Sequence, residues 1–211
     1  MLYAPVNITV AEAKIIKAEL FKFLHSWVRY QKNSDLLYLE SQFIGLDRHE
    51  LPTKTQAPVL HDILRRMQID NLWHMLCFIV VSDNKEFPIH IDDYDQTWTA
   101  IGLNVPVLNC QDSKTVWYDS SPETNPAMPD YISSLSHHAT IATKCTSSDV
   151  KEIGSCDANI PHWINVSVPH APVCNHSKLR INSSLRFQFD CSVDDFFVDP
   201  KFEHCMIKKL S

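Results

Sequence analysis

Two residues with metal-binding side chains stand two positions apart in the segment Phe87–Asp92. In an extended backbone His90 and Asp92 would project to the same face, because successive side chains of a strand alternate between its two faces. An imidazole and a carboxylate on one face can bind the same ion. Short His/Asp pairs also arise by chance, so this pair indicates a metal site only together with a third ligand from elsewhere in the chain.

The third candidate ligand is His170, which follows an apolar run and ends a strand that the pattern predicts. Two neutral imidazoles and one carboxylate form the facial triad that is typical of non-haem iron(II), in which three coordination positions stay open. We therefore predict that His90, Asp92 and His170 bind one divalent metal ion.

Arg180 stands ten positions after His170 and extends the pattern. The order of H-x-D, strands, a histidine and an arginine resembles that of the iron(II)- and 2-oxoglutarate-dependent dioxygenases, over roughly residues 71–191. The stretches Gly102–Cys110 and Thr115–Tyr118 also look like the aspartyl/asparaginyl β-hydroxylase-like and phytanoyl-type members, and the sequence does not choose between these subfamilies. The resemblance implies a double-stranded β-helix, which is a jelly-roll or cupin-like barrel.

The same resemblance implies a reaction and its participants. These are Fe(II), 2-oxoglutarate and O2, with hydroxylation of a C–H bond and release of succinate and CO2. His90, Asp92 and His170 would be the catalytic metal ligands. Arg180 would pair with the distal carboxylate of 2-oxoglutarate, which a guanidinium fork matches in shape and charge. Related halogenases lack the carboxylate ligand, so the presence of Asp92 favours hydroxylation or a similar oxidation.

The segment that carries Arg180 alternates cleanly between apolar and polar residues. One face holds Leu179, Ile181, Ser183, Leu185, Phe187 and Phe189, and the other holds Arg180, Asn182, Ser184, Arg186, Gln188 and Asp190. If the polar face looks into the barrel, Arg180 and Ser184 converge on the bound dicarboxylate, and Arg186 is a second basic candidate. If that face looks to solvent, the pattern is that of an ordinary exposed sheet. Many family members carry a serine two residues after the arginine, whereas this chain has Asn182 there.

Asn104 and Tyr118 are polar residues inside predicted strands that are otherwise apolar. Each is a candidate hydrogen-bonding partner for the keto-acid end of the cosubstrate or for another ligand, and each could equally be a satisfied polar group of the core. His137, His138 and His176 belong to no pair of motifs with zinc-finger spacing, so we expect these histidines in loops.

The elements that would position these residues are two helices followed by β-rich segments. Thr9 and Glu12 have the spacing of a capping box, and the apolar stripe that follows predicts one amphipathic helix over residues 10–31. Pro58 opens a shorter helical pattern. The predicted β-rich segments are residues 72–82, 97–108, 114–119, 139–145, 160–169 and 178–190. We expect a mainly β protein with the N-terminal helices packed outside the barrel, and an irregular loop over the barrel mouth at Pro122, Pro126 and Pro129.

The length and composition suit a single domain. A chain of 211 residues that is 45% hydrophobic can bury one sizeable core. We expect one domain over residues 1–211, with a helical part at about 1–70, a barrel at about 71–191 and a C-terminal extension at 192–211. The 3 glycines form neither a phosphate-binding loop, nor a dinucleotide fingerprint, nor a nucleophile elbow. This argues against kinases, common NAD enzymes and serine hydrolases.

The charge and the cysteines bear on partners and compartment. A formal charge of -6 argues against nucleic acid and anionic lipid as partners. The first 20 residues lack the pattern of a secretory signal, the longest apolar stretch, LCFIVV, is too short to cross a bilayer, and 7 cysteines without a C-x-x-C pair indicate reduced thiols. We expect a cytoplasmic protein without membrane association that acts on a small-molecule or peptide substrate. The identity of the substrate and the oligomeric state stay open.

Two other functions remain open at this level. A cupin-type metalloenzyme that does not use 2-oxoglutarate would keep the metal and the barrel but would not need Arg180. A non-catalytic β-barrel binding module would need none of His90, Asp92 and His170.

Overall fold

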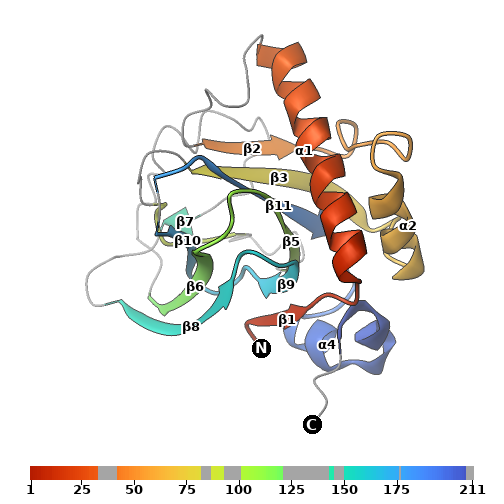
Figure 1. Ribbon diagram of the computed structural model, residues 1–211. Helices are drawn as coiled ribbons and strands as arrows, with labels where there is room; N and C mark the ends of the chain where they lie inside the picture. The colour runs from red at the N-terminus through yellow and green to blue at the C-terminus, as the bar shows by residue number, and fades with distance from the viewer. Residues whose placement is uncertain are drawn as a thin grey trace.

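The strands of the protein form two antiparallel sheets in the computed structural model, which describes residues 1–32, 42–81, 87–92, 101–120, 143–144, 150–175 and 177–207 (Figure 1). The six-stranded sheet has the order β1 (Tyr3–Pro5), β9 (His162–Asn165), β5 (Ile101–Leu108), β11 (Arg180–Phe187), β3 (Trp73–Val81), β2 (Gln42–Leu46). The five-stranded sheet has the order β7 (Thr143–Lys144), β4 (His90–Ile91), β10 (His170–Cys174), β6 (Ser113–Asp119), β8 (Lys151–Asp157). The prediction of a mainly β protein is therefore confirmed.

From β3 onward the chain passes back and forth between the two sheets. β3, β5, β9 and β11 belong to the six-stranded sheet, whereas β4, β6, β7, β8 and β10 belong to the other, in which β6, β7 and β8 follow one another along the chain. As a result β11 pairs with both β3 and β5, and β10 pairs with both β4 and β6. The sequence had predicted a barrel, but among the described residues no strand joins the two sheets into a closed one. Side chains and short turns bridge the sheets instead.

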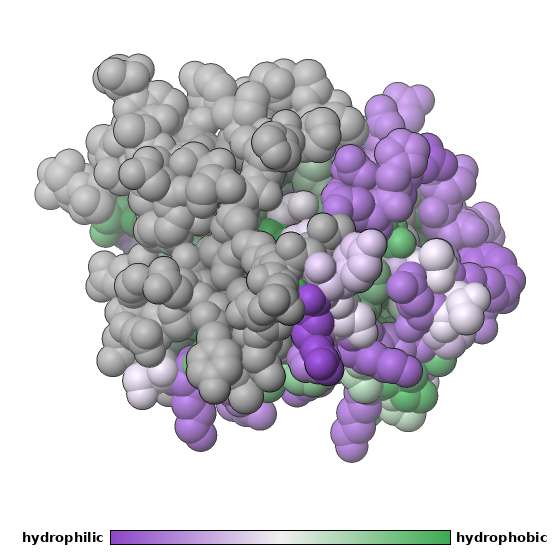
Figure 2. Space-filling view, turned by 90° about the horizontal axis from the view of Figure 1, so that it is seen from above, coloured by the Kyte–Doolittle hydropathy of each residue, from purple (hydrophilic) through white to green (hydrophobic). Residues whose placement is uncertain are grey.

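Helix α1 (Val10–Lys32) covers the six-stranded sheet on the side away from the five-stranded one (Figure 1). The predicted capping box is present, since the Thr9 amide donates to Glu12 Oε2 at 2.7 Å and the Glu12 amide donates to Thr9 Oγ1 at 3.1 Å. The apolar stripe of the helix, including Leu20 and Leu24, is buried in the main core with residues of the sheet. Hydrophilic side chains gather on the outer side of the helices (Figure 2).

Helix α2 (Pro58–Arg66) is oriented by α1. Its N-cap residue, Ala57, offers no side-chain hydrogen bond. The carboxylate of Glu19 on α1 supplies the missing acceptors. It accepts hydrogen bonds from the backbone amides of Val59 at 2.9 Å and Leu60 at 3.0 Å. No helix in the described part of the chain is long and apolar enough to cross a bilayer.

The C-terminal extension, for which no secondary structure was predicted, contains α4 (Val193–Val198) and the 3-10 helix η2 (Pro200–Cys205). A capping box between Ser192 and Asp195 begins α4. The extension packs against Trp163 of β9, whose indole Nε1 donates to the Cys205 carbonyl at 2.9 Å. These turns close the lower end of the six-stranded sheet beside β1 (Figure 1).

Five strands lie outside the predicted β-rich segments, namely β1, β2, β4, β8 and β10. Of these, β1, β2 and β8 are each the last described strand at one edge of a sheet, where one strand side lacks the pairing that selects for a strong apolar pattern. The predicted segments 97–108 and 139–145 contain β5 and β7. The remainder of these two ranges, together with Pro122, Pro126 and Pro129, lies outside the described residues.

The predicted strand 160–169 is shorter than expected, and His170 begins a strand instead of ending one. β9 ends at Asn165, whose Oδ1 accepts hydrogen bonds from the amide of Ser167 at 3.0 Å and from its hydroxyl at 2.7 Å. This local turn bends the chain out of the six-stranded sheet. The chain then starts β10 at His170 in the other sheet.

Candidate metal centre

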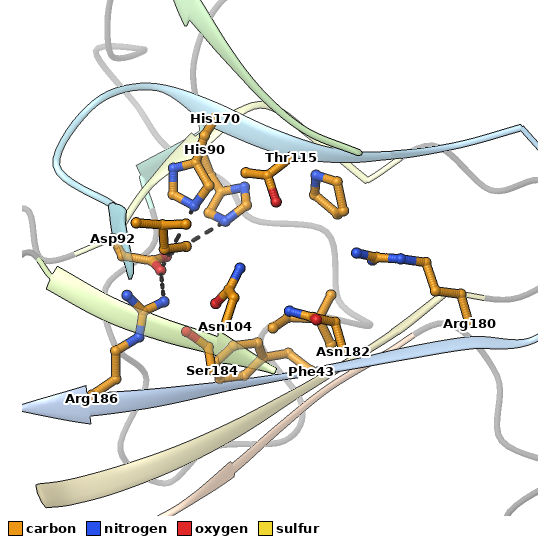
Figure 3. A pocket seen from close by; sticks show the side chains of 13 residues that line it. Phe43, His90, Asp92, Asn104, Thr115, His170, Arg180, Asn182, Ser184 and Arg186 are labelled. Carbon is orange, nitrogen blue, oxygen red and sulfur yellow. Dashed lines mark hydrogen bonds and ion pairs between the residues drawn. The ribbon is translucent and has the colours of Figure 1, made fainter. Parts of the chain in front are cut away.

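Three side chains with metal-binding atoms converge where β4 and β10 pair inside the five-stranded sheet. His90 of β4 pairs in register with His170 of β10, and the Asp92 amide donates to the Val166 carbonyl at 3.0 Å. The ligand atoms of His90, Asp92 and His170 all lie within 4.8 Å of one another, and all three residues are buried (Figure 3). No other such group occurs in the described part of the chain. The structure thus brings together the three residues that the spacing had singled out.

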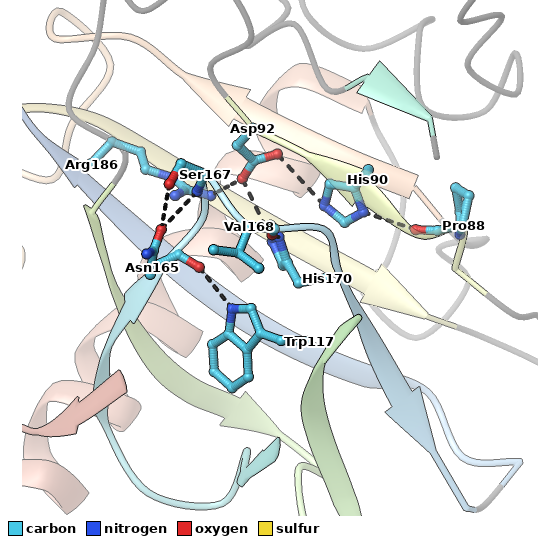
Figure 4. A network of polar contacts seen from close by, with 9 residues as sticks. All are labelled: Pro88, His90, Asp92, Trp117, Asn165, Ser167, Val168, His170 and Arg186. Carbon is cyan, nitrogen blue, oxygen red and sulfur yellow. Dashed lines mark hydrogen bonds and ion pairs between the residues drawn. The ribbon is translucent and has the colours of Figure 1, made fainter. Parts of the chain in front are cut away.

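The two imidazoles are held in the orientation that metal binding needs. His90 Nδ1 lies 2.8 Å from the Pro88 carbonyl, and His170 Nδ1 lies 2.9 Å from the Val168 carbonyl (Figure 4). A carbonyl can only accept, so each Nδ1 carries the proton and each Nε2 presents a lone pair. These Nε2 atoms lie 3.5 Å and 4.0 Å from the oxygens of Asp92.

The electrostatic surroundings favour the protonation states of a metal site. Burial, reinforced by the neighbouring His90, lowers the pKa of His170 to about 3, so this imidazole is neutral near pH 7. Burial alone would raise the pKa of the Asp92 carboxyl. The charge and hydrogen bond of Arg186, together with the neighbouring His90 and His170, outweigh this effect and hold that pKa below its usual range. A neutral imidazole and an ionised carboxylate are the ligand forms that a divalent cation requires.

Arg186 lies at the metal end of the site, although the sequence offered it as a second anchor for a cosubstrate carboxylate. Its guanidinium donates a hydrogen bond to Asp92 Oδ2. Gly102 on the neighbouring strand β5 makes this position possible. A Cβ atom there would lie 2.8 Å from Arg186 Nη1 and 2.9 Å from Ser184 Oγ. This role of Gly102 was not predicted from the sequence, where the scarcity of glycines was the available signal.

Arg180 lies at the opposite end of the same pocket (Figure 3). It is 1% exposed, its Nε donates to Ser113 Oγ at 3.0 Å, and its Nη1 has no hydrogen-bond partner among the described residues. The polar face of β11 is therefore buried between the sheets and not exposed to solvent. This outcome corresponds to the first of the two alternatives that the alternating pattern left open.

The pocket contains several buried polar atoms without a hydrogen-bond partner among the described residues. They are Asn104 Oδ1, Ser184 Oγ, Arg186 Nε and Nη1, and Arg180 Nη1. Each such atom costs about 1–3 kcal/mol when it stays unpaired, so their concentration in one pocket indicates a polar ligand. The donors among them fit a molecule with carboxylate groups at both ends. Tyr118 is not among the residues that line this pocket.

Other lining residues were not singled out as site residues. Thr115 of β6 and Asn182 of β11 add polar groups, while Phe43, Ile79 and Pro172 provide apolar walls. The alternating pattern had put Asn182 on the correct face, but no sequence signal distinguished Thr115. His137, His138 and His176 lie outside the described residues.

Comparison with known proteins gives distant structural similarity only. No protein-family model matches the chain, and no curated protein matches it. The chain is similar to HygX from Streptomyces hygroscopicus, solved with nickel and 2-oxoglutarate bound, with 12% identity, 90% of this chain and 83% of that chain covered, and a TM-score of 0.42. It is also similar to ycfD from E. coli, with 12% identity, 64% and 31% covered, and a TM-score of 0.28. At these scores we rest the functional proposal on the geometry of the site.

Proposed function

We propose that this protein is a single-domain non-haem iron(II)- and 2-oxoglutarate-dependent oxygenase that hydroxylates a C–H bond of a small-molecule or peptide substrate. The observation that carries the proposal is one buried pocket with His90, Asp92 and His170 at one end and Arg180 at the other. The Nη1 atom of Arg180 has no hydrogen-bond partner among the described residues. The repeated passage of the chain between two sheets supports it, since such a passage is typical of a jelly-roll, double-stranded β-helix.

The residues present fit an iron(II) ion. Two imidazole Nε2 atoms and one carboxylate form a facial set of three ligands, which suits iron(II) and leaves positions for other molecules. When bound, the metal supplies oxygen activation coupled to decarboxylation of 2-oxoglutarate to succinate and CO2. The backbone carbonyls of Pro88 and Val168 hold both imidazoles in the required tautomer.

The residues present also fit 2-oxoglutarate. The Arg180 guanidinium can donate to the distal carboxylate, and Asn104, Ser184 and Arg186 offer polar atoms nearer the metal end. The apolar side chains of Phe43, Ile79 and Pro172 lie between or beside these groups and limit the access of water to the reacting atoms. The chain's contribution to the reaction is thus to orient its partners and to keep the pocket dry.

An anaerobic titration with iron(II) and 2-oxoglutarate tests the proposal. The native protein should develop the weak visible charge-transfer band of a chelated keto acid. Asp92→Ala should abolish iron binding, with Asp119→Ala at the exposed end of β6 as the matched control. Arg180→Ala should weaken 2-oxoglutarate binding but keep iron binding, with the exposed Arg29→Ala of α1 as its control. Succinate release with a panel of substrates then tests hydroxylation.

Different failures of this titration point to different functions. If iron binds but Arg180→Ala leaves 2-oxoglutarate binding unchanged, the protein is better described as a cupin-type metalloenzyme that uses no keto acid. If the native protein takes up no iron(II), the non-catalytic binding module replaces the enzyme proposal.

A further inference from the structure

The turn between β5 and β6 is tied to the start of β11 on both sides of Arg180. The side-chain amide of Asn109 donates to the Leu179 carbonyl at 2.8 Å. The thiol of Cys110 donates to the Ile181 carbonyl at 3.1 Å. The residues before and after Arg180 are therefore both fixed to this turn, which carries the chain from one sheet into the other.

Ser113, at the end of the same turn, contacts the Arg180 side chain itself. Its hydroxyl donates to the Cys110 carbonyl at 2.8 Å. A hydroxyl has one proton, so toward Arg180 Nε, 3.0 Å away, Ser113 Oγ acts as the acceptor. Ser113 is 2% exposed and Arg180 is 1% exposed, so water does not compete for these bonds.

This arrangement fixes the plane of the guanidinium before any ligand binds. The Nε–H group of Arg180 is used in the hydrogen bond to Ser113. Nη1 has no partner among the described residues, and Arg180 lines the pocket. An arginine side chain carries about 2 kcal/mol of rotamer entropy. Because packing and Ser113 restrict the side chain during folding, the ligand does not have to order it on binding.

We propose that Ser113 is a positioning residue that presets the Arg180 guanidinium for the distal carboxylate of a dicarboxylic keto acid. The inference rests on the proposed function, because it takes Arg180 as the anchor of that carboxylate. Ser113 is not one of the described residues that line the pocket, so it acts through Arg180. Its effect is therefore confined to ligands that use the arginine.

Ser113→Ala, Ser113→Thr and Ser183→Ala form the test set. Ser183→Ala is the matched control, since Ser183 is also a fully buried serine whose hydroxyl donates to a backbone carbonyl, that of Val105 at 3.0 Å. Anaerobic titrations of the iron-loaded proteins use two ligands. One is 2-oxoglutarate, and the other is 2-oxopentanoate, which has the same chain length but no distal carboxylate.

We expect Ser113→Ala to weaken 2-oxoglutarate binding roughly tenfold, the effect of losing one hydrogen bond to a charged group. Its binding of 2-oxopentanoate should stay within about twofold, which also reports an intact fold and metal site. Ser113→Thr keeps the hydroxyl and should bind 2-oxoglutarate about as tightly as the native protein. Ser183→Ala should not change the ratio of the two affinities.

Two results would overturn the inference about Ser113. One is an equal loss for both keto acids in Ser113→Ala, which indicates a structural role only. The other is an unchanged ratio in Ser113→Ala while Arg180→Ala abolishes the preference for 2-oxoglutarate. If Arg180→Ala itself leaves that preference unchanged, the proposed function fails, and the inference about Ser113 falls with it.

Discussion

Arg186 and Asp92 form a buried ion pair that links β11 of the six-stranded sheet to the metal-binding segment after β4. The guanidinium of Arg186 donates a hydrogen bond to Asp92 Oδ2, while Asp92 Oδ1 lies 3.5 Å from His90 Nε2. Both side chains are less than a tenth exposed. The pair therefore fixes the direction of the carboxylate and compensates its charge in the absence of a metal ion.

Replacing Arg186 by methionine should destabilise the metal-free protein by about 3–5 kcal/mol, since it leaves Asp92 buried without its partner. A divalent cation should recover part of this loss, because the ion then compensates the carboxylate. Urea unfolding with and without cobalt(II) measures both effects. In a double-mutant cycle, Asp92→Asn combined with Arg186→Met should cost less than the sum of the single changes. Simple additivity would contradict the coupling.

Gly102→Ala should disturb the same ion pair sterically. The new Cβ would lie 2.8 Å from Arg186 Nη1, the mobile end of a long side chain, so the guanidinium shifts while the strand stays in place. We expect a metal affinity roughly tenfold lower with a nearly unchanged unfolding midpoint. Gly154→Ala is the control, since its Cβ meets Leu2 Cδ1 at 2.7 Å outside the pocket. Equal metal affinities in the two variants would argue against a role of Gly102 in the site.

Asn165 should be essential for the bend that leads to His170. Besides its two bonds with Ser167, its carbonyl accepts the indole Nε1 of Trp117 at 2.8 Å (Figure 4). Asn165→Ala removes the side-chain acceptor and should cost about 1–3 kcal/mol of unfolding free energy and weaken metal binding. Asn165→Asp keeps an acceptor for Ser167 and should retain more metal affinity. Calorimetric metal titrations compare the two variants, and wild-type affinity in Asn165→Ala would refute this role.

The cap of α1 should make stability depend on pH in the acidic range. Hydrogen bonds from Arg66 and the Thr9 amide lower the pKa of Glu12 from 4.5 to about 2, against an opposing effect of burial. The unfolded chain binds the proton more readily, so this stabilisation is complete above pH 4.5 and is lost as the pH falls toward 2. Glu12→Gln should thus cost about 1 kcal/mol at pH 7 and less at pH 3. Urea midpoints at both pH values measure this, with Glu152→Gln on the exposed surface as control. A cost that is independent of pH would contradict the assignment.

Local periodicity determined those parts of the protein that depend on neighbouring residues. The two-residue spacing of His90 and Asp92 set their common face, the capping box of Thr9 and Glu12 set the start of α1, and the alternation after Leu179 separated the two faces of β11. In each case the backbone geometry of a single element is sufficient. The edge strands β1, β2 and β8 lack such a signal, so their patterns did not reveal them.

Tertiary structure alone decided how the two ends of the pocket are built. Arg180 and Arg186 share one strand face, and six residues of strand separate them by on the order of 20 Å. Which of them meets Asp92 depends on the register of β11 with β5 and on the placement of β4 in the facing sheet. The same long-range register puts Ser113 beside Arg180 and Gly102 beneath Arg186. No spacing within the sequence encodes these contacts, because they join residues that are far apart along the chain and become neighbours only when the two sheets pack.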